Sequence, residues 1–443
     1  MATSYISTLT SDQIPTLSTA AIASLGADDW AAFSTVQFQA LTASQAAVIS
    51  AAQVPGIPAG TLGAIEVVDL QALRSSALRA LSDTQLGALG PTQIAGLTLA
   101  QVGNLTVSQV AGLGSDDLVA LSSSQYAVLG SGQAAALSAA QLGAVETADL
   151  AAMSTGAIRA LTLTALAGLS TAQMAALTGA QAIALTTAQL AALSTAQAAA
   201  LDTADLGAFG SAALRAMSPS AIAGLTSAQI QSLSGTQFAA LTSAQIGALT
   251  TAQMAVLETA DLAALTTAQL RVLGAPQLDA LGSAQFAALT SKQVLALSST
   301  QVAGLSSDDL NALTSTQFAL LTSAQIGALS AGRMATLETA DLAALGSAAL
   351  RAIPVASIPS LTSAEIQALS TAQAAVLTTA QIGALLSAQI AALETADLAA
   401  LTTAQVRTLS DAQLAALDSA QMPAFSTRQI AALGSAQVTG LAS

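Results

Sequence analysis

The chain has 443 residues, of which 53% are hydrophobic although only 2% are aromatic. Charged residues make up 8% and give a net charge of −14, so Lys and Arg are too few for a phosphate-binding surface, and we expect no nucleic-acid partner. The sequence has no Cys and no His, which excludes disulfides, thiolate and imidazole catalysis and the usual zinc sites.

The chain opens with Met-Ala-Thr-Ser-Tyr-Ile, which lacks the basic and apolar segments of a leader, so we expect no cleaved signal peptide. From Leu9 to Leu441 every eighth residue is a large hydrophobe, 55 positions without an insertion or deletion. Each eight-residue repeat is an octad, numbered from this hydrophobe. The strict register predicts one short unit stacked on itself, so that residues 1–443 form a single continuous solenoid.

The typical octad, L-[ST]-x-x-Q-[IVLM]-x-A, contains the signals that begin a helix. Ser or Thr at position 2 and Gln at position 5 make a capping box, and the apolar residues at positions 1 and 6 make a hydrophobic staple. We therefore predict an all-α solenoid with one very short helix per octad. Such helices are unstable alone, so positions 1, 6 and 8 should be buried against neighbouring octads. A β-solenoid is the alternative.

Prolines and aromatic residues fit this interpretation. Pro91 and Pro219 stand at position 3, the first helical position, where proline is favoured. We interpret the densest aromatic group, near the N-terminal end, as core filling; it consists of Trp30, Phe33 and Phe38. Four prolines at position 7 predict shortened or distorted helices, and they are Pro15, Pro55, Pro359 and Pro423.

A charge pattern recurs on top of the octads: an acid is followed by Asp after three residues and by Arg after thirteen. We name each copy a cassette, and the six cassettes are Glu66/Asp69/Arg79, Glu146/Asp149/Arg159, Asp202/Asp205/Arg215, Glu258/Asp261/Arg271, Glu338/Asp341/Arg351 and Glu394/Asp397/Arg407. Successive cassettes are 80, 56, 56, 80 and 56 residues apart, which is ten or seven octads. These spacings become three and two whole turns if one coil holds roughly 3.4 octads, which would align the cassettes on one face.

The cassettes allow two interpretations. In the first they are structural, because an acid at a helix N-terminus is favoured by the macrodipole and the arginine can pair with it. In the second they form an interaction face that docks on another copy of the chain. Acid pairs allow a Ca²⁺ site as a further alternative, although no loop has a calcium-binding spacing; the pairs are Asp28-Asp29, Asp116-Asp117 and Asp308-Asp309. We expect no cofactor and no catalytic residue.

Two further features bear on partners. Residues 160–201 carry no charge, but Gln recurs in them every eight residues, which a lipid-facing helix would not tolerate, so we expect no membrane span. The octad register runs to within a few residues of both ends without a capping segment. We therefore expect apolar ends that favour head-to-tail stacking.

The L-T-x-x-Q-I-x-A run, as in residues 241–248, resembles the Ala/Thr/Gln-rich octapeptide arrays of some bacterial surface, adhesin-like and haem-utilisation proteins. The resemblance covers nearly the whole chain and implies a protein at the bacterial surface. The haem label is not supported, because without His or Cys only Met or Tyr could ligate iron.

We therefore expect a non-enzymatic, self-assembling structural protein of an extracellular filament, adhesin or surface layer, secreted without a cleaved signal peptide. Its partner would be a second copy, bound head-to-tail or laterally. An intracellular scaffold that binds another protein is the main alternative. Ice binding by rows of Thr and Ser is a third class, although these residues are mostly committed to capping.

Overall fold

The computed structural model describes residues 4–441, and the chain divides into two compact units, unit 1 (Met1–Ser232) and unit 2 (Leu233–Ser443). Within the described residues there are α-helices of four to seven residues, a few 3₁₀ helices and no strand. The predicted solenoid of short helices is confirmed, and the β-solenoid is wrong. That the two units continue one solenoid stays a prediction. No helix of residues 4–441 is long and apolar enough to cross a membrane.

The helices of unit 1, with 3₁₀ helices marked η, are η1 Tyr5–Thr8, η2 Ser11–Thr16, α1 Thr19–Ala23, α2 Ala27–Ala31, α3 Thr35–Gln39, α4 Ala43–Ala46, η3 Val54–Gly56, α5 Ala59–Leu62, α6 Val67–Ala72, α7 Ser75–Arg79, α8 Asp83–Leu86, α9 Pro91–Ala95, α10 Leu99–Asn104, α11 Val107–Gly112, α12 Ser115–Ala120, α13 Ser123–Ala127, α14 Ser131–Ala135, α15 Ala139–Ala144, α16 Thr147–Ala152, α17 Thr155–Ala160, α18 Leu163–Ala167, α19 Thr171–Ala175, α20 Gly179–Ala184, α21 Thr187–Ala192, α22 Thr195–Ala199, α23 Thr203–Ala208, α24 Ser211–Ala216, α25 Pro219–Ala223 and α26 Ser227–Gln231.

The helices of unit 2 are α27 Gly235–Ala240, α28 Ser243–Gly247, α29 Thr251–Ala255, α30 Thr259–Ala264, α31 Thr267–Arg271, α32 Ala275–Asp279, α33 Ser283–Ala287, α34 Ser291–Ala296, α35 Ser299–Gly304, α36 Ser307–Asn311, α37 Ser315–Phe318, α38 Ser323–Ile326, α39 Ala331–Met334, α40 Thr339–Ala344, α41 Ser347–Ala352, η4 Val355–Ser360, α42 Ser363–Gln367, α43 Thr371–Val376, α44 Thr379–Ala384, α45 Ser387–Ala391, α46 Thr395–Ala400, α47 Thr403–Val406, α48 Asp411–Ala415, η5 Met422–Ala424, α49 Thr427–Ala431 and α50 Ser435–Leu441.

The predicted capping box begins most of these helices, as α11 illustrates. The Gln109 N–H donates to Thr106 Oγ1 at 3.2 Å, while the Thr106 N–H donates to Gln109 Oε1 at 2.9 Å. The helix ends at Gly112, and the next residue, Leu113, is extended and donates its N–H to the Val110 carbonyl at 3.3 Å. No described residue has a positive φ, so the chain turns from one octad to the next without the left-handed glycine that commonly ends helices.

The prolines act as predicted. Pro91 and Pro219 are the first residues of α9 and α25. Each position-7 proline falls in a 3₁₀ helix instead of an α-helix, because proline has no N–H for the bond to the carbonyl four residues earlier. These prolines are Pro15 in η2, Pro55 in η3, Pro359 in η4 and Pro423 in η5.

The core of each unit is a stack of thin apolar layers. Positions 6 and 1 are buried, as at Ile246 and Leu249, and burial of these two positions is confirmed. Burial of position 8 is wrong for most octads, where that residue is only half-buried; the third buried position is 5. The N-terminal aromatic group is core filling as predicted, with the rings of Trp30 and Phe33 stacked at 5.0 Å between centroids.

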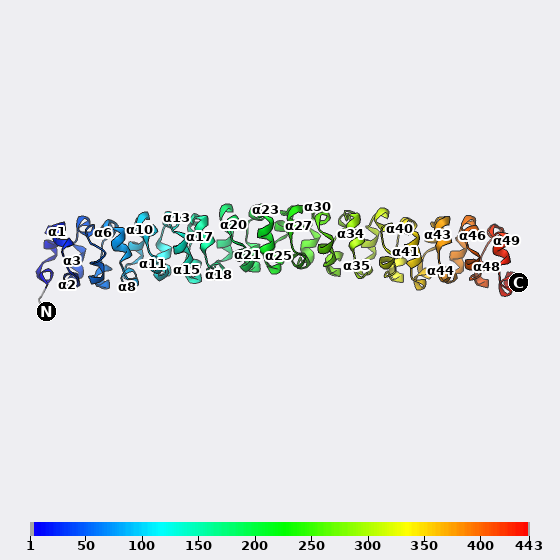
Figure 1. Cartoon of the computed structure of the whole chain (residues 1–443), viewed down its shortest axis with the longest axis horizontal. Coiled ribbons are helices and arrows are strands. Elements are labelled where there is room, and N and C mark those ends of the chain that lie inside the picture. The colour runs from blue at the N-terminus through cyan, green and yellow to red at the C-terminus, as the bar shows by residue number, and fades with distance from the viewer. Residues whose placement is uncertain (1–3, 442–443) are drawn as a thin grey trace. The chain divides into compact units, whose positions relative to one another are not determined.

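One coil of the solenoid contains three to four octads. Helices pack on the helix three octads further along, as α14 does on α17 and α27 on α30. Figure 1 shows α6, α13 and α20 of unit 1 along one edge and α11, α18 and α25 along the opposite edge, with seven octads between neighbours in each row. Seven octads are therefore about two turns, in agreement with the predicted coil of roughly 3.4 octads.

Candidate interaction face

The side chain at position 5 joins each helix to the previous coil. Gln101 accepts the Thr98 N–H on Oε1 at 3.0 Å, and its Nε2 donates to the carbonyl oxygens of Leu70 and Leu73 at 2.8 and 3.0 Å. These acceptors stand at positions 6 and 1 of the earlier coil. Because Gln101 is buried, one amide group satisfies three backbone groups that water cannot reach.

The same arrangement recurs in unit 2. Gln293 accepts the Thr290 N–H at 2.8 Å and donates to the carbonyl oxygens of Leu262 and Leu265 at 2.7 and 2.9 Å. The capping box predicted only the Oε1 half of this role. The sequence did contain a signal for the Nε2 half. Position 5 is usually a long amide, although a short acceptor would cap the helix equally well.

Ten octads carry an acid at position 5 instead of glutamine or another residue. In one group the carboxylate accepts the N–H of its own position 2, as the amide oxygen would; this group is Asp29, Asp117, Asp309, Asp397 and Glu365. The second group makes no such bond in the described chain and consists of the cassette residues Asp69, Asp149, Asp205, Asp261 and Asp341. None of these acids can donate as the glutamine Nε2 does while it is ionised.

The structure places all six cassette aspartates inside the fold. They stand at position 5 and are 1–8% exposed; they are Asp69, Asp149, Asp205, Asp261, Asp341 and Asp397. The sequence pattern groups them with the predicted interaction face, but their position beneath the surface leaves only the other cassette members available to a partner.

Those other members are exposed. The first acid of every cassette stands at the N-cap of its helix, and these residues are Glu66, Glu146, Asp202, Glu258, Glu338 and Glu394. The arginines stand at position 7 of the following octad and are Arg79, Arg159, Arg215, Arg271, Arg351 and Arg407. Figure 1 shows the cassette helices α6 and α23 of unit 1 on the same edge.

Within the described residues no ion pair joins the acid and the arginine of one cassette. Arg271 instead donates from Nε to the Ala296 carbonyl at 3.0 Å, at the end of a helix on the next coil. Gln71 and Asn311, also at position 7, make the same type of bond to Gly96 and Thr336. Side chains at position 7 therefore donate hydrogen bonds to carbonyl groups of the following coil. A cation is favourable at such a helix C-terminus.

Burial raises the pKa values of several cassette carboxyl groups. Desolvation raises the pKa of Asp69 and of Asp261 to about 6, and the nearby charges of Glu66 and Glu258 add to the effect. Desolvation also raises the pKa values of Asp205 and Asp341. Asp29 behaves in the opposite way, because hydrogen bonds from Ser4 and Gly26 lower its pKa.

Two cassettes place a serine against the aspartate. Ser123 Oγ donates to Asp149 Oδ1 at 2.6 Å, and Ser315 Oγ donates to Asp341 Oδ1 at 3.1 Å. Near Asp149 the buried hydroxyl of Tyr126 donates to the Leu118 carbonyl at 2.8 Å. That carbonyl lies 31 residues before Asp149, where a glutamine would have donated, so the tyrosine supplies the donor that the aspartate lacks.

The acid pairs proposed for calcium do not gather into a site. One member of each pair accepts hydrogen bonds within its own capping box: Asp29, Asp117 and Asp309. Residues 4–441 contain no group of three or more Asp, Glu, His or Cys able to hold a metal ion.

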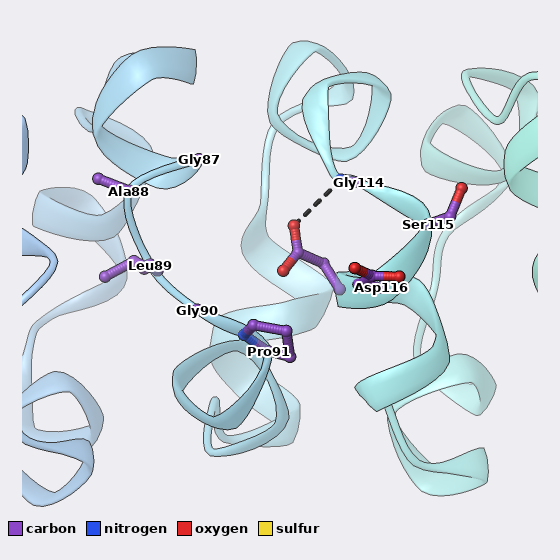
Figure 2. A pocket seen from close by; sticks show the side chains of 9 residues that line it. Gly87, Ala88, Leu89, Gly90, Pro91, Gly114, Ser115 and Asp116 are labelled. Carbon is purple, nitrogen blue, oxygen red and sulfur yellow. Dashed lines mark hydrogen bonds between the residues drawn. The ribbon is translucent and has the colours of Figure 1, made fainter.

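Figure 2 shows the groove beside one pair, about 510 Å³ in volume, between residues 87–91 and the start of α12 at residues 114–117. Glycine and backbone form much of its lining. Asp116 is exposed at its margin, whereas Asp117 accepts the Gly114 N–H at 3.0 Å. The groove is thus lined by two carboxylates, one of them engaged in helix capping, and by no basic residue.

A family model for the ALTTAQ repeat matches the chain seven times, at residues 62–99, 110–145, 142–179, 198–235, 254–291, 334–371 and 390–427, which together exceed half of the chain. The chain belongs to the ALTTAQ repeat family. No curated protein matches it. Every match begins seven residues before an aspartate at position 5, as residue 62 precedes Asp69 and residue 254 precedes Asp261. The ALTTAQ unit is therefore in register with the acid at position 5.

The ALTTAQ repeats of the two units are themselves equivalent. Each aspartate at position 5 from Asp69 onward in unit 1 returns in unit 2 after 192 residues, or 24 octads. The pairs are Asp69/Asp261, Asp117/Asp309, Asp149/Asp341 and Asp205/Asp397. The octad register of one unit can therefore be compared with that of the other residue by residue.

Proposed function

We propose that this ALTTAQ repeat protein is a non-enzymatic structural protein that associates laterally with copies of itself. The observation that carries the proposal is the exposed charge of the cassettes, unpaired within each cassette and recurring with the same 80- and 56-residue spacings in both units. A second copy can place acids against these arginines at several points together. One exposed pair contributes under about 1 kcal/mol, but several pairs in one register act as a multivalent contact.

The remaining polar groups support a structural role. The amides at position 5 are buried and bonded to backbone, and the hydroxyls at position 2 are largely committed to helix capping. These regularly repeated amides and hydroxyls therefore stabilise the solenoid. With neither His nor Cys in the sequence, no imidazole base or thiolate is available for catalysis.

We place this assembly outside a bacterial cell, as a filament, adhesin or surface layer. The support is the resemblance of the octad to the Ala/Thr/Gln-rich arrays of bacterial surface proteins and the absence of reactive cysteine. Protease treatment of intact cells tests this location, since a surface protein is degraded and an intracellular scaffold is protected.

Sedimentation velocity tests the lateral contact. Oligomers present at about 0.05 M salt should dissociate at about 1 M, where the Debye length falls to about 3 Å. The variant Arg79→Gln/Arg159→Gln/Arg215→Gln should shift the protein toward monomer. A matched control, Arg74→Gln/Lys292→Gln/Arg428→Gln, removes the same charge from exposed residues outside the cassettes and should leave association intact.

Three results would contradict the lateral contact. A wild-type protein that stays monomeric at low salt would rule out self-association. Equal loss of association in both variants would show that net charge, and not the cassettes, matters. Assembly that ignores salt would indicate an apolar, head-to-tail contact instead.

A further inference from the structure

The two equivalent cassettes of α6 and α30 bury a carboxyl group with no opposite charge beside it. Asp69 is 2% exposed and Asp261 is 4% exposed. Neither carboxylate accepts the N–H of its own N-cap residue in the described chain, and that residue is itself an acid, Glu66 or Glu258. The like charge of this acid, three residues away, disfavours ionisation of the aspartate.

The residues that could face Asp69 from neighbouring elements are uncharged. Helix α6 packs against α4 and α9, and Gln101 of α10 donates to Leu70. Neither α4, α9 nor α10 contains a titratable residue. The next helix begins after Arg74 and ends at Arg79, and both arginines are exposed. Glu66 is therefore the charged residue closest in sequence, and its sign is the same.

Asp261 has matching surroundings in unit 2. Helix α30 packs against α27 and α33, neither of which contains a titratable residue. Gly235 of α27 approaches the carboxylate, since a Cβ there would lie 3.5 Å from Asp261 Oδ1. Lys292 on α34 is exposed, and Arg271 on the next helix donates to Ala296.

Position 5 normally presents a donor to the earlier coil. For Asp69 the carbonyl groups 31 and 28 residues earlier are those of Phe38 and Leu41, the positions to which Gln101 and its counterparts donate. A carboxylate offers these carbonyls only negative charge, whereas a protonated carboxyl is neutral and carries a hydrogen. The coil contact at this point is therefore more favourable when the carboxyl group holds a proton.

We propose that Asp69 and Asp261 are proton-binding contacts between successive coils, and that each unit is held more tightly in mildly acidic solution than at neutral pH. The raised pKa values of both residues agree with this geometry. Because the folded carboxyl keeps its proton up to about pH 6 while an unfolded one loses it near pH 4, stability falls as pH rises from about 4 to about 6 and then levels off.

The experiment compares the full-length wild type with Asp69→Asn/Asp261→Asn. A control, Asp12→Asn/Asp279→Asn, removes two exposed carboxylates, one from each unit. Between pH 7.5 and 5, potentiometric titration of the folded wild type should show uptake of about two protons per chain that the buried double variant lacks and the control retains. The wild-type unfolding midpoint should rise by about 2–4 °C over this interval, and the buried double variant should lose most of that rise.

A second variant covers the case in which asparagine disturbs folding. Asp69→Gln/Asp261→Gln gives both octads the ordinary residue and should have a higher unfolding midpoint than the wild type at pH 7.5, with little change on acidification. Equal proton uptake by the wild type and the buried variants would overturn the proposal. So would a wild-type midpoint that stays constant or falls between pH 7.5 and 5. Both readouts are independent of self-association when measured on dilute protein at high salt.

Discussion

Unit 1 and unit 2 carry equivalent cassettes 192 residues apart. These cassettes differ in the hydrogen bonds made around the buried aspartate. At Asp149 the hydroxyl of Tyr126 donates to the Leu118 carbonyl. At the equivalent Asp341 the ring is Phe318, which has no hydroxyl, and Asp341 Oδ2 is buried without a partner. An aspartate at position 5 thus removes a donor between coils, and a neighbouring side chain can replace that donor.

A second difference supports the same conclusion. Gln173 in unit 1 donates to the carbonyl oxygens of Leu142 and Val145 at 2.8 and 2.7 Å. Its equivalent in unit 2 is Glu365, whose Oε2 keeps the capping bonds to Thr362 while its buried Oε1 has no partner. Capping and coil-to-coil bonding are therefore separate roles of one side chain, and the second fails when the amide becomes a carboxylate.

Removal of the amide from an equivalent pair of octads should have the largest effect. Gln101→Met and Gln293→Met each keep a buried side chain of similar length but remove three hydrogen bonds, which leaves one carbonyl group and one N–H without partners. We expect each substitution to lower the free energy of unfolding by about 2–4 kcal/mol, measured by urea titration. The two values should agree, since both glutamines make the same three bonds.

Exposed glutamines provide the control for this comparison. Gln39 in unit 1 and Gln367 in unit 2 stand at position 7 on the surface. Gln39→Met and Gln367→Met should change stability by less than about 0.5 kcal/mol. If the buried and exposed substitutions have equal effects, the amides at position 5 do not hold the coils together.

A single substitution at either Glu365 or Gln173 should make position 5 of these two octads alike. Glu365→Gln restores a donor beneath the carbonyls of the earlier coil and should stabilise the protein at pH 7 by about 1–2 kcal/mol. Gln173→Glu should destabilise it by a similar amount, and chemical denaturation measures both. A destabilising Glu365→Gln would show that the carboxylate has a favourable partner in solution.

Exchange of the two rings should have a smaller effect. Tyr126→Phe removes the hydroxyl donor of the Leu118 carbonyl, which keeps only the Leu121 N–H, and should lower the free energy of unfolding by about 1 kcal/mol. Phe318→Tyr adds a hydroxyl beside the Leu310 carbonyl and should raise it by up to about 1 kcal/mol. The prediction fails if the two substitutions change stability in the same direction, because the difference between the units would then lie elsewhere.

The sequence was sufficient to predict most of the fold. The eight-residue register, the capping box and the prolines at position 7 are local signals, and each appears in the structure as expected. The coil size followed from the cassette spacings, because residues that recur on one face must be separated by whole turns. Local patterns do not state which groups meet between coils, so the Nε2 bonds of Gln101 and its counterparts were missed.

The candidate site was harder to predict from the sequence for the same reason. An acid at position 5 looks like a surface charge when Glu66 and Asp69 are read as one group. Burial of Asp69 becomes evident only when position 5 is recognised as an inward position. The role of Tyr126 also depends on a carbonyl eight residues away that an absent glutamine would have bonded.

The central claim is that successive coils meet at residues 25 apart in both units, and engineered disulfides test it most directly because the chain has no cysteine. A Cβ at Gly103 would lie 3.9 Å from the Cβ of Val128, and one at Gly383 would lie 3.9 Å from that of Thr408, within the 3.5–4.5 Å that disulfides require. Gly103→Cys/Val128→Cys and Gly383→Cys/Thr408→Cys should therefore oxidise readily. Gly103→Cys/Ala136→Cys, spaced for a coil of four octads, should stay reduced, and the opposite outcome would contradict the account.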